Sequence, residues 1–130
     1  MSITAVHTDK APEAVGPYSQ GIITDCNKLF FSAGQIGLDP EKNSLISSTF
    51  KLQAEQALKN LQAVLTEAGS SLDKVIKVTV YLKNIDDYNE FNKMYATFFK
   101  HNPPARSAIE VAALPKNALI EIECIACITK

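Results

Sequence analysis

The sequence predicts an α+β protein in which two helices pack on one face of a single mixed β-sheet. Two stretches have the apolar spacing of amphipathic helices, and most other apolar stretches alternate as strands do. The elements follow the order β-β-β-α-β-α-β-β. With 130 residues, 46% of them hydrophobic and 21% charged, the chain fits one globular domain over residues 1–130.

The first part of the chain predicts short strands joined by loops. Met1–Lys10 alternates weakly, which favours a short edge strand. Ala11–Tyr18 contains two prolines and a glycine, so we expect a loop there. Strands are predicted over Gly21–Thr24 and Leu29–Ala33, and the polar turn between them favours a hairpin of these two strands.

Helical spacing begins after Thr49 and is followed by an alternating stretch. Gly69 ends the helical spacing and is a candidate C-cap. Val75–Leu82 alternates, which predicts a strand with Ile76 on the same face as its other apolar residues. The apolar residues of the helix are Ala54, Ala57, Leu58, Leu61, Val64, Leu65 and Ala68.

A second helix is predicted after Asp87. Asp87 and Glu90 have the spacing of a capping box, and Pro103 ends the helix. Its apolar stripe consists of Tyr88, Phe91, Met94, Tyr95, Phe98 and Phe99.

Two closing strands are predicted over Arg106–Val111 and Leu119–Ile128, with a turn at residues 115–117. On the last strand, Ile120, Ile122, Cys124, Ala126 and Ile128 are expected to lie under the helices. The opposite face is too apolar to be left in water, so we expect an oligomer that buries this face and forms a pocket there. That face carries Leu119, Glu121, Glu123, Ile125 and Cys127.

Charge and hydropathy argue against nucleic acid and membranes as partners. The formal net charge is −1 and no basic block is present, which argues against nucleic acid as a partner. No apolar stretch has the length of a membrane span, and residues 1–10 lack the apolar segment of a signal peptide. We therefore expect a soluble, cytoplasmic protein that does not contact membranes.

The three cysteines are expected to be free thiols, because their number is odd and no export signal is present. Cys124 and Cys127 form a C-x-x-C, but residues three apart on a strand point to opposite faces. Core packing is therefore favoured over a redox or metal role. With only His7 and His101 besides, no zinc pattern exists, and we expect neither a metal nor a cofactor.

Arg106 has two interpretations. It follows two prolines at the mouth of a strand, where a salt bridge to Glu110, Glu121 or Glu123 is the structural interpretation. The functional interpretation is a planar fork that holds a substrate carboxylate. Glu121 likewise either pairs with Arg106 or deprotonates a water beside a bound electrophile.

Three further side chains are weaker candidates. Tyr18 is either a packing aromatic or a lid over a small ligand, since it lies between Pro17 and Gly21. Ser32 and Ser107 lack the surroundings of a nucleophilic serine. The residues alone therefore predict a small oligomer with an Arg/Glu pocket for an unidentified ligand.

Several short motifs along nearly the whole chain resemble the Rid/YjgF family of reactive-intermediate deaminases. The C-terminal motifs are highly specific in combination. The motifs include Gly16-Pro17-Tyr18-Ser19-Gln20-Gly21, Ser32-Ala33-Gly34-Gln35-Ile36, Val78-Thr79-Val80-Tyr81-Leu82, Pro104-Ala105-Arg106-Ser107, Leu114-Pro115-Lys116 and Ile120-Glu121-Ile122-Glu123.

The resemblance implies a chorismate-mutase-like fold and a homotrimer with sites in clefts between subunits. It also implies hydrolysis of 2-imino acids, such as 2-iminobutanoate and 2-iminopropanoate, to 2-keto acids and ammonia. These imines and their enamine tautomers damage other enzymes, so the implied role is metabolite damage control. An imine carbon is already electrophilic, so water attack needs positioning rather than a metal.

The resemblance also implies roles for individual residues. Arg106 is expected to bind the substrate carboxylate, and Glu121 is expected to lie near the attacking water. Tyr18 would close the pocket from a neighbouring subunit, and Asn92 would support the site. Substrate contacts are also expected at Ser32, Ser107 and Ala108. Many members carry Cys or Thr where this chain has Ala108, so backbone contacts are expected to replace a side chain there.

Two other functions share these features. A regulatory trimer that binds small metabolites without turnover would need Arg106 but not a second acid at Glu121. A ribonuclease or translation inhibitor is disfavoured, because the charge is near neutral and no histidine pair is apparent.

Overall fold

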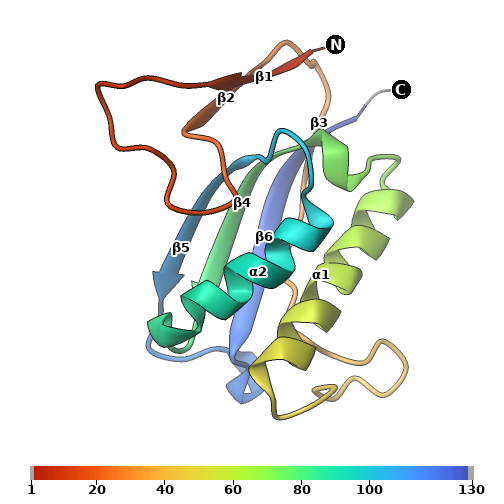
Figure 1. Ribbon diagram of the computed structural model, residues 1–130. Helices are drawn as coiled ribbons and strands as arrows, with labels where there is room; N and C mark the ends of the chain where they lie inside the picture. Colours follow the sequence, from red (N-terminus) through yellow and green to blue (C-terminus); the bar gives the residue numbers. More distant parts are fainter. Residues whose placement is uncertain (1, 129–130) are drawn as a thin grey trace.

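The computed structural model describes residues 2–128 (Figure 1). A four-stranded sheet is covered on one face by both helices, and a second, two-stranded sheet lies beside it. This confirms the α+β class and the two helices. The elements are β1 (Ile3–Val6), β2 (Gly21–Thr24), β3 (Leu29–Phe31), α1 (Phe50–Glu67), β4 (Val75–Leu82), α2 (Tyr88–Phe98), β5 (Ala105–Glu110) and β6 (Ile120–Cys127). Three short 3-10 helices are η1 (Leu72–Lys74), η2 (Ile85–Asp87) and η3 (Pro115–Asn117).

The larger sheet is mixed, as predicted. Its strand order is β3-β6-β4-β5, with β4 and β5 parallel and the other pairs antiparallel. Helix α2 connects the parallel pair β4 and β5. Strand β5 therefore lies at an edge of the sheet, and β6 lies in its centre.

The core lies between this sheet and the helices. Alternate residues of β6 are buried there, from Ile120 to Ala126, as the alternation predicts. Gly69 follows α1 with a φ of 84°, a left-handed conformation that favours glycine, so the predicted helix end is confirmed. The buried helix residues include Ala54, Ala57, Leu58, Leu61, Leu65, Phe91, Met94 and Tyr95.

Ile76 differs from the prediction. A β-bulge shifts the register of β4 between Val75, which pairs with Ala126, and Lys77, which pairs with Ile125. Val75 is buried as a result, whereas Ile76 is only half-buried. The extra residue of a bulge interrupts the alternation of faces, which strict period-two reasoning does not anticipate.

The predicted hairpin of Gly21–Thr24 with Leu29–Ala33 is wrong. Strand β2 pairs with β1, from Ile3↔Thr24 to Val6↔Gly21, whereas β3 pairs with β6. Alternation reveals a strand but not its partner, and a short turn between two strands does not by itself make them pair. Residues 2–128 thus form two sheets rather than one. We call residues 2–28 the N-terminal arm (Figure 1); Met1, the first residue of the predicted edge strand, lies outside the described residues.

The expectation of free thiols is wrong for two of the three cysteines. Cys26 and Cys127 form a disulfide that joins residues 101 positions apart and ties the N-terminal arm to the end of β6. Cys124 is free and buried under the helices. The two cysteines of the C-x-x-C do lie on opposite faces, but neither their spacing nor the odd count revealed the distant partner.

The predicted capping box at α2 is also wrong, because the Asp87 side chain makes no capping hydrogen bond. The chain begins to turn earlier, at η2, where Asn84 accepts a hydrogen bond from the backbone of Asp86. The predicted turn at residues 115–117 is confirmed: Lys116 and Asn117 both have a φ of 56°.

Neither helix of residues 2–128 combines the length and the apolar character that crossing a membrane requires.

Candidate functional site

Arg106 is the second residue of β5, and its side chain is buried beneath the N-terminal arm and helix α2. Only 7% of Arg106 is exposed. β5 begins directly after the two prolines, as the sequence predicts, and Ser19 of the arm donates a backbone hydrogen bond to the carbonyl of Pro104 (3.1 Å). The start of β5 is therefore fixed by the arm on its open edge.

Four aromatic rings surround the guanidinium group, and we call them the aromatic box. The distances from Cζ of Arg106 to the ring centroids are 5.2 Å for Tyr18, 5.5 Å for Tyr88, 5.4 Å for Phe91 and 4.9 Å for Tyr95. Rings at such distances attract a cation through their electron-rich faces. Tyr18 comes from the arm, and the other three come from α2.

The guanidinium group has one hydrogen bond within the box. Nη2 donates to the hydroxyl of Tyr88 at 3.0 Å, whereas Nε and Nη1 are buried and have no partner among residues 2–128. The Oδ1 atom of Asn92 and the hydroxyl of Tyr95 are also buried and unpaired. Because a buried charge without a counter-ion is unfavourable, these donors favour an anionic ligand.

The salt bridge of the structural interpretation is not formed. Across residues 2–128, no carboxylate makes an ion pair with Arg106. Glu110 instead accepts a hydrogen bond from the backbone of Ile85 at 2.9 Å. Burial raises the pKa of the Tyr95 hydroxyl, and the charge of Arg106 opposes this increase. Tyr95 therefore stays neutral and supplies no charge to balance Arg106.

Gly16 brings the arm into close contact with the box. A Cβ atom on Gly16 would lie 3.1 Å from Nδ2 of Asn92, 3.2 Å from Nη2 of Arg106 and 3.3 Å from the hydroxyl of Tyr88. A larger residue would push the loop away from the guanidinium group. Glycine therefore lets the arm close over the box.

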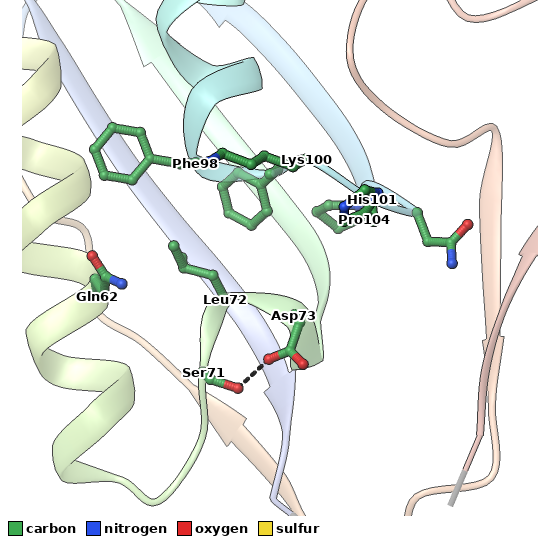
Figure 2. A pocket seen from close by; sticks show the side chains of 10 residues that line it. Gln62, Ser71, Leu72, Asp73, Phe98, Lys100, His101 and Pro104 are labelled. Carbon is green, nitrogen blue, oxygen red and sulfur yellow. Dashed lines mark hydrogen bonds between the residues drawn. The ribbon is translucent and has the colours of Figure 1, made fainter.

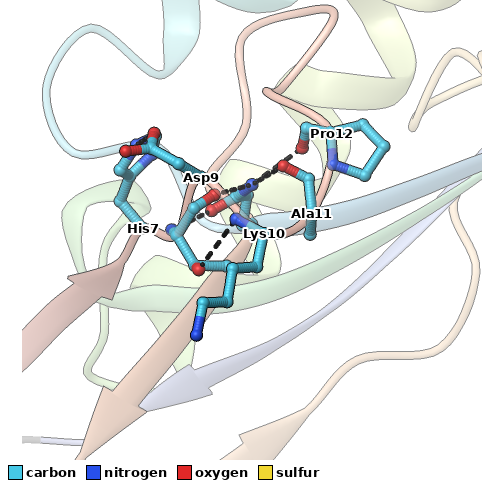
Figure 3. A network of polar contacts seen from close by, with 7 residues as sticks. His7, Asp9, Lys10, Ala11 and Pro12 are labelled. Atoms are coloured by element: carbon cyan, nitrogen blue, oxygen red, sulfur yellow. Dashed lines mark hydrogen bonds and ion pairs between the residues drawn. The ribbon is translucent and has the colours of Figure 1, made fainter.

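Residues of the arm's long loop, His7 and Asp9 to Pro12 among them, form a network of polar contacts (Figure 3). The side chain of Gln20 organises this loop. Oε1 of Gln20 accepts a hydrogen bond from the Thr8 backbone N–H (2.7 Å), and its Nε2 donates to the carbonyls of Thr8 (3.1 Å) and Pro12 (2.7 Å). His7 and Asp9 form an exposed pair at 3.0 Å beside it. The loop thus holds its shape through its own polar groups.

Glu121 lies on the other face of the sheet from Arg106. Arg106 pairs in register with Val78, which faces the helices, whereas Glu121 pairs with Tyr81, which faces away from them. The carboxylate of Glu121 lies against Gly34, where any Cβ atom would overlap with it. A single chain therefore does not bring the two predicted catalytic side chains together.

Other polar groups share the face of Glu121. Tyr81 donates a hydrogen bond to Glu123 at 3.1 Å, and burial together with this bond raises the pKa of Tyr81. Lys77 donates to the hydroxyl of Ser107 at 3.2 Å. This face therefore carries two half-exposed acids with polar neighbours.

Ser32 has a structural contact. Its hydroxyl accepts a hydrogen bond from the backbone N–H of Cys124 at 2.9 Å, which continues the pairing of β3 with β6. Burial raises the pKa of the Cys124 thiol to about 11, so this thiol stays protonated near neutral pH. Neither group has the surroundings of a nucleophile.

Ala108 lies two residues after Arg106 and on the same face of β5. Together with Ile85, Asp86, Tyr88 and Asn89 it lines an open groove of about 500 Å³. Tyr88 belongs both to this groove and to the aromatic box. The groove is therefore the open space next to the buried guanidinium group.

A second cavity of about 340 Å³ lies between η1 and the end of α2 (Figure 2). Its lining includes Leu72, Phe98 and Pro104, and two other lining residues are joined by a hydrogen bond that Ser71 donates to Asp73. None of the residues that the sequence predicts for the site lines this cavity. We therefore place the candidate site at Arg106.

The structure brings together only part of the predicted site. Tyr18, Asn92 and Arg106 cluster, with Ala108 close by, whereas Ser32, Ser107 and Glu121 lie elsewhere. Sequence reasoning missed Gly16, Tyr88 and Gln20. The helical stripe did place Tyr88 on the inner face of α2, but no pattern indicated that a cation inserts there.

Residues 8–128 match the family model described as endoribonuclease L-PSP, the model of the Rid/YjgF family. The chain belongs to this family. The resemblance drawn from the sequence motifs is confirmed.

Relatives in the Rid/YjgF family carry different functional names. The human protein named 2-iminobutanoate/2-iminopropanoate deaminase is 46% identical, over 93% of this chain and 87% of its own length. AldR of Lactococcus lactis, which is named as a regulator, is 50% identical over 93% of this chain and 94% of its own length. TdcF of Escherichia coli, whose crystal structure was solved with bound serine, has 34% sequence identity to this chain. The two structures superpose with a TM-score of 0.74, over 97% of this chain and 99% of TdcF.

Proposed function

We propose that this protein hydrolyses 2-imino acids, such as 2-iminobutanoate and 2-iminopropanoate, to 2-keto acids and ammonia. The observation that carries the proposal is the buried guanidinium group of Arg106, which has donors on Nε and Nη1 and no anion to receive them. A substrate carboxylate would satisfy these donors with charge-assisted hydrogen bonds. The deaminase name of the human relative supports the choice of reaction.

The reaction needs few groups. Arg106 holds the carboxylate, and Glu121 accepts a proton from a water molecule whose oxygen bonds to the imine carbon. Glu121 passes this proton to the imine nitrogen, which gives a carbinolamine. The carbinolamine then collapses: Glu121 moves the hydroxyl proton to the nitrogen, the C–N bond breaks, the C=O bond forms and ammonia leaves. These reaction steps require no metal, cofactor or redox change.

We propose that each site lies between two subunits of a homotrimer with a chorismate-mutase-like fold. Arg106 and Glu121 lie on opposite faces of one sheet, so a site that contains both needs two chains. The face of Glu121 also exposes Phe31 (65%) and Ile109 (48%). Such apolar side chains favour contact with another copy.

The remaining predicted residues have supporting roles in this proposal. The resemblance implied that Tyr18 closes the pocket of a neighbouring subunit, whereas in this proposal Tyr18 covers Arg106 of its own chain. Asn92 offers its unpaired Oδ1 atom to the substrate nitrogen. Backbone N–H groups near Ser107 and Ala108 provide further donors at the sheet edge. Ser32 holds β3 to β6 beside Glu121.

The alternative is a regulatory trimer that binds a small carboxylate without turnover. The name of AldR supports it. Such a protein would use Arg106 in the same way but would not depend on Glu121. A ribonuclease or translation-inhibitor role has weaker support, because the net charge is −1.

The test generates 2-iminobutanoate from threonine with a dehydratase, in the presence of semicarbazide, which traps free imine. Catalytic amounts of the protein should suppress semicarbazone formation, and Arg106→Ala and Glu121→Gln should each abolish the suppression. Glu123→Gln is the matched control, because Glu123 lies on the same strand and face but bonds to Tyr81. Failure of the wild type to suppress trapping would overturn the deaminase proposal in favour of the binding trimer.

A mixing experiment tests the shared site. Arg106→Ala and Glu121→Gln subunits, unfolded together and refolded, should recover up to about a quarter of wild-type activity, because some neighbouring pairs regain both residues. Each variant refolded alone should stay inactive. No recovery from mixtures that form trimers by light scattering would contradict a site between subunits.

A further inference from the structure

Tyr88 is the first residue of α2 and lies between the guanidinium group and the open groove. Its hydroxyl is 3.0 Å from Nη2 of Arg106, and its ring is one wall of the groove that Ala108 also lines. Among the described residues, this hydroxyl is the only hydrogen-bond acceptor that the Arg106 side chain has.

The other tyrosines of the box differ from Tyr88. The hydroxyl of Tyr18 accepts a hydrogen bond from the backbone N–H of Val15 at 3.1 Å, and the hydroxyl of Tyr95 is unpaired. All three rings are at similar distances from the cation, between 4.9 and 5.5 Å. Only Tyr88 therefore adds a directional contact to the ring contact.

The groove is within reach of a small substrate held by Arg106. Two residues on the same face of a strand are about 7 Å apart, so Ala108 lies about that far from Arg106 along β5. A 2-imino acid with its carboxylate on the guanidinium group would extend its other end past Tyr88 toward Ala108. The small side chain of Ala108 leaves this space open.

We propose that Tyr88 is the positioning residue of the site. Its hydroxyl fixes the guanidinium group by accepting one Nη2 hydrogen bond, so that the unpaired donors face a carboxylate entering from the groove. The proposal rests on the proposed function and adds a residue to it. Tyr88 touches neither the imine carbon nor the water; it acts through Arg106.

The proposal makes a kinetic distinction. Without the hydroxyl, all donors of the guanidinium group lack a partner and its orientation is no longer fixed. Carboxylate binding then weakens, whereas the chemistry at the imine carbon is unchanged. A contact that acts equally on bound substrate and transition state changes KM and leaves kcat alone.

The experiment compares Tyr88→Phe with Tyr95→Phe, which both keep the ring and remove one hydroxyl. Tyr88→Phe should raise KM about tenfold for both 2-iminobutanoate and 2-iminopropanoate, with kcat within about twofold. The increase in KM should be at least about five times larger than the increase for Tyr95→Phe. Equal KM values for the two variants, or a loss confined to kcat, would overturn the proposal.

A binding measurement separates this proposal from the proposed function. Calorimetric titration with 2-oxobutanoate, a stable carboxylate, needs no turnover. If the wild type binds it and Tyr88→Phe binds about tenfold more weakly, the positioning role stands even when no imine is hydrolysed. If both proteins bind it equally, or neither binds it, the positioning role is wrong.

Discussion

The N-terminal arm and the rest of the molecule are held in place in different ways. The rest, which we call the body, consists of α1, α2 and the four-stranded sheet, and its inner residues are almost completely inaccessible. The arm has little interior: three of the four residues of β1 are exposed, and Ile23 of β2 is 64% exposed. Apolar burial therefore stabilises the body but contributes little to the arm.

Individual contacts hold the arm instead. The Cys26–Cys127 disulfide fixes its end, Ser19 bonds to the carbonyls of Pro103 and Pro104, and the Tyr18 ring lies on Arg106. The candidate site lies where the two regions meet. The body supplies the cation and the arm covers it, so the cover can change without unfolding the body.

The largest expected effect concerns the body. Leu61→Ala removes a fully buried side chain of α1 and should lower the free energy of unfolding by about 3–5 kcal/mol. Leu52→Ala, on the same helix but 48% exposed, should change it by less than about 0.5 kcal/mol. Urea titration measures both. Similar losses for the two variants would contradict a body stabilised by its interior.

The next largest effect concerns the disulfide between the arm and the body. Cys26→Ser removes the disulfide and should cost about 2–4 kcal/mol, because the unfolded chain loses a cross-link that closes a long loop. Adding a reducing agent should destabilise the wild type by the same amount and leave Cys26→Ser unchanged. A variant as stable as the wild type would mean that the arm is held without the bond.

A smaller effect is expected within the arm alone. Gln20→Ala removes the side chain that bonds to Thr8 and Pro12 and should weaken the loop locally by about 1 kcal/mol. Faster amide exchange at residues 8–11, with an unchanged urea midpoint, is the expected result. If the loss of stability measured by the urea midpoint equals the loss measured by amide exchange in the loop, arm and body unfold together.

The smallest effect depends on pH and concerns the surface of the body. Burial, followed by the charges of Glu90 and Asp86, raises the pKa of Asp87. A raised pKa means that the folded state binds the proton more tightly, so ionisation of Asp87 destabilises the fold as the pH rises through that pKa.

Asp87→Asn should therefore stabilise the protein by about 0.3 kcal/mol at pH 7. The gain should disappear below about pH 3, where the carboxyl is mostly protonated in both the folded and the unfolded state. Thermal unfolding at the two pH values measures the difference. A gain of equal size at both values would mean that the charge of Asp87 is not its cause.

The body was predicted more completely than the arm, whose two strands were placed but whose pairing and cross-links were not. Helical spacing and alternation arise from contacts with one core, so they placed both helices and the long strands β4 and β6 close to their observed positions. The arm depends on partners that leave no periodic signal. Cys26 gives no sign of Cys127, and Gln20 bonds mostly to backbone groups that any residue carries.

The site shows the same division. The alternation of β6 placed Glu121 on the face away from the helices, as observed. The sequence of β5 did not show which face of the sheet Arg106 lies on, because an arginine in an apolar strand is normally expected to reach water. Only the register of β5 with β4 shows that Arg106 points toward the helices. The separation of the two residues therefore followed from pairing, not from local sequence.

The aromatic box also provides the protein with a spectroscopic probe of its own. The chain has four tyrosines and no tryptophan, and three of the tyrosines surround Arg106. Tyrosine fluorescence therefore comes largely from the candidate site, undisturbed by indole emission. An unlabelled sample can thus report occupancy of the site by its optical signal, and Tyr81, on the other face, is the main source of background.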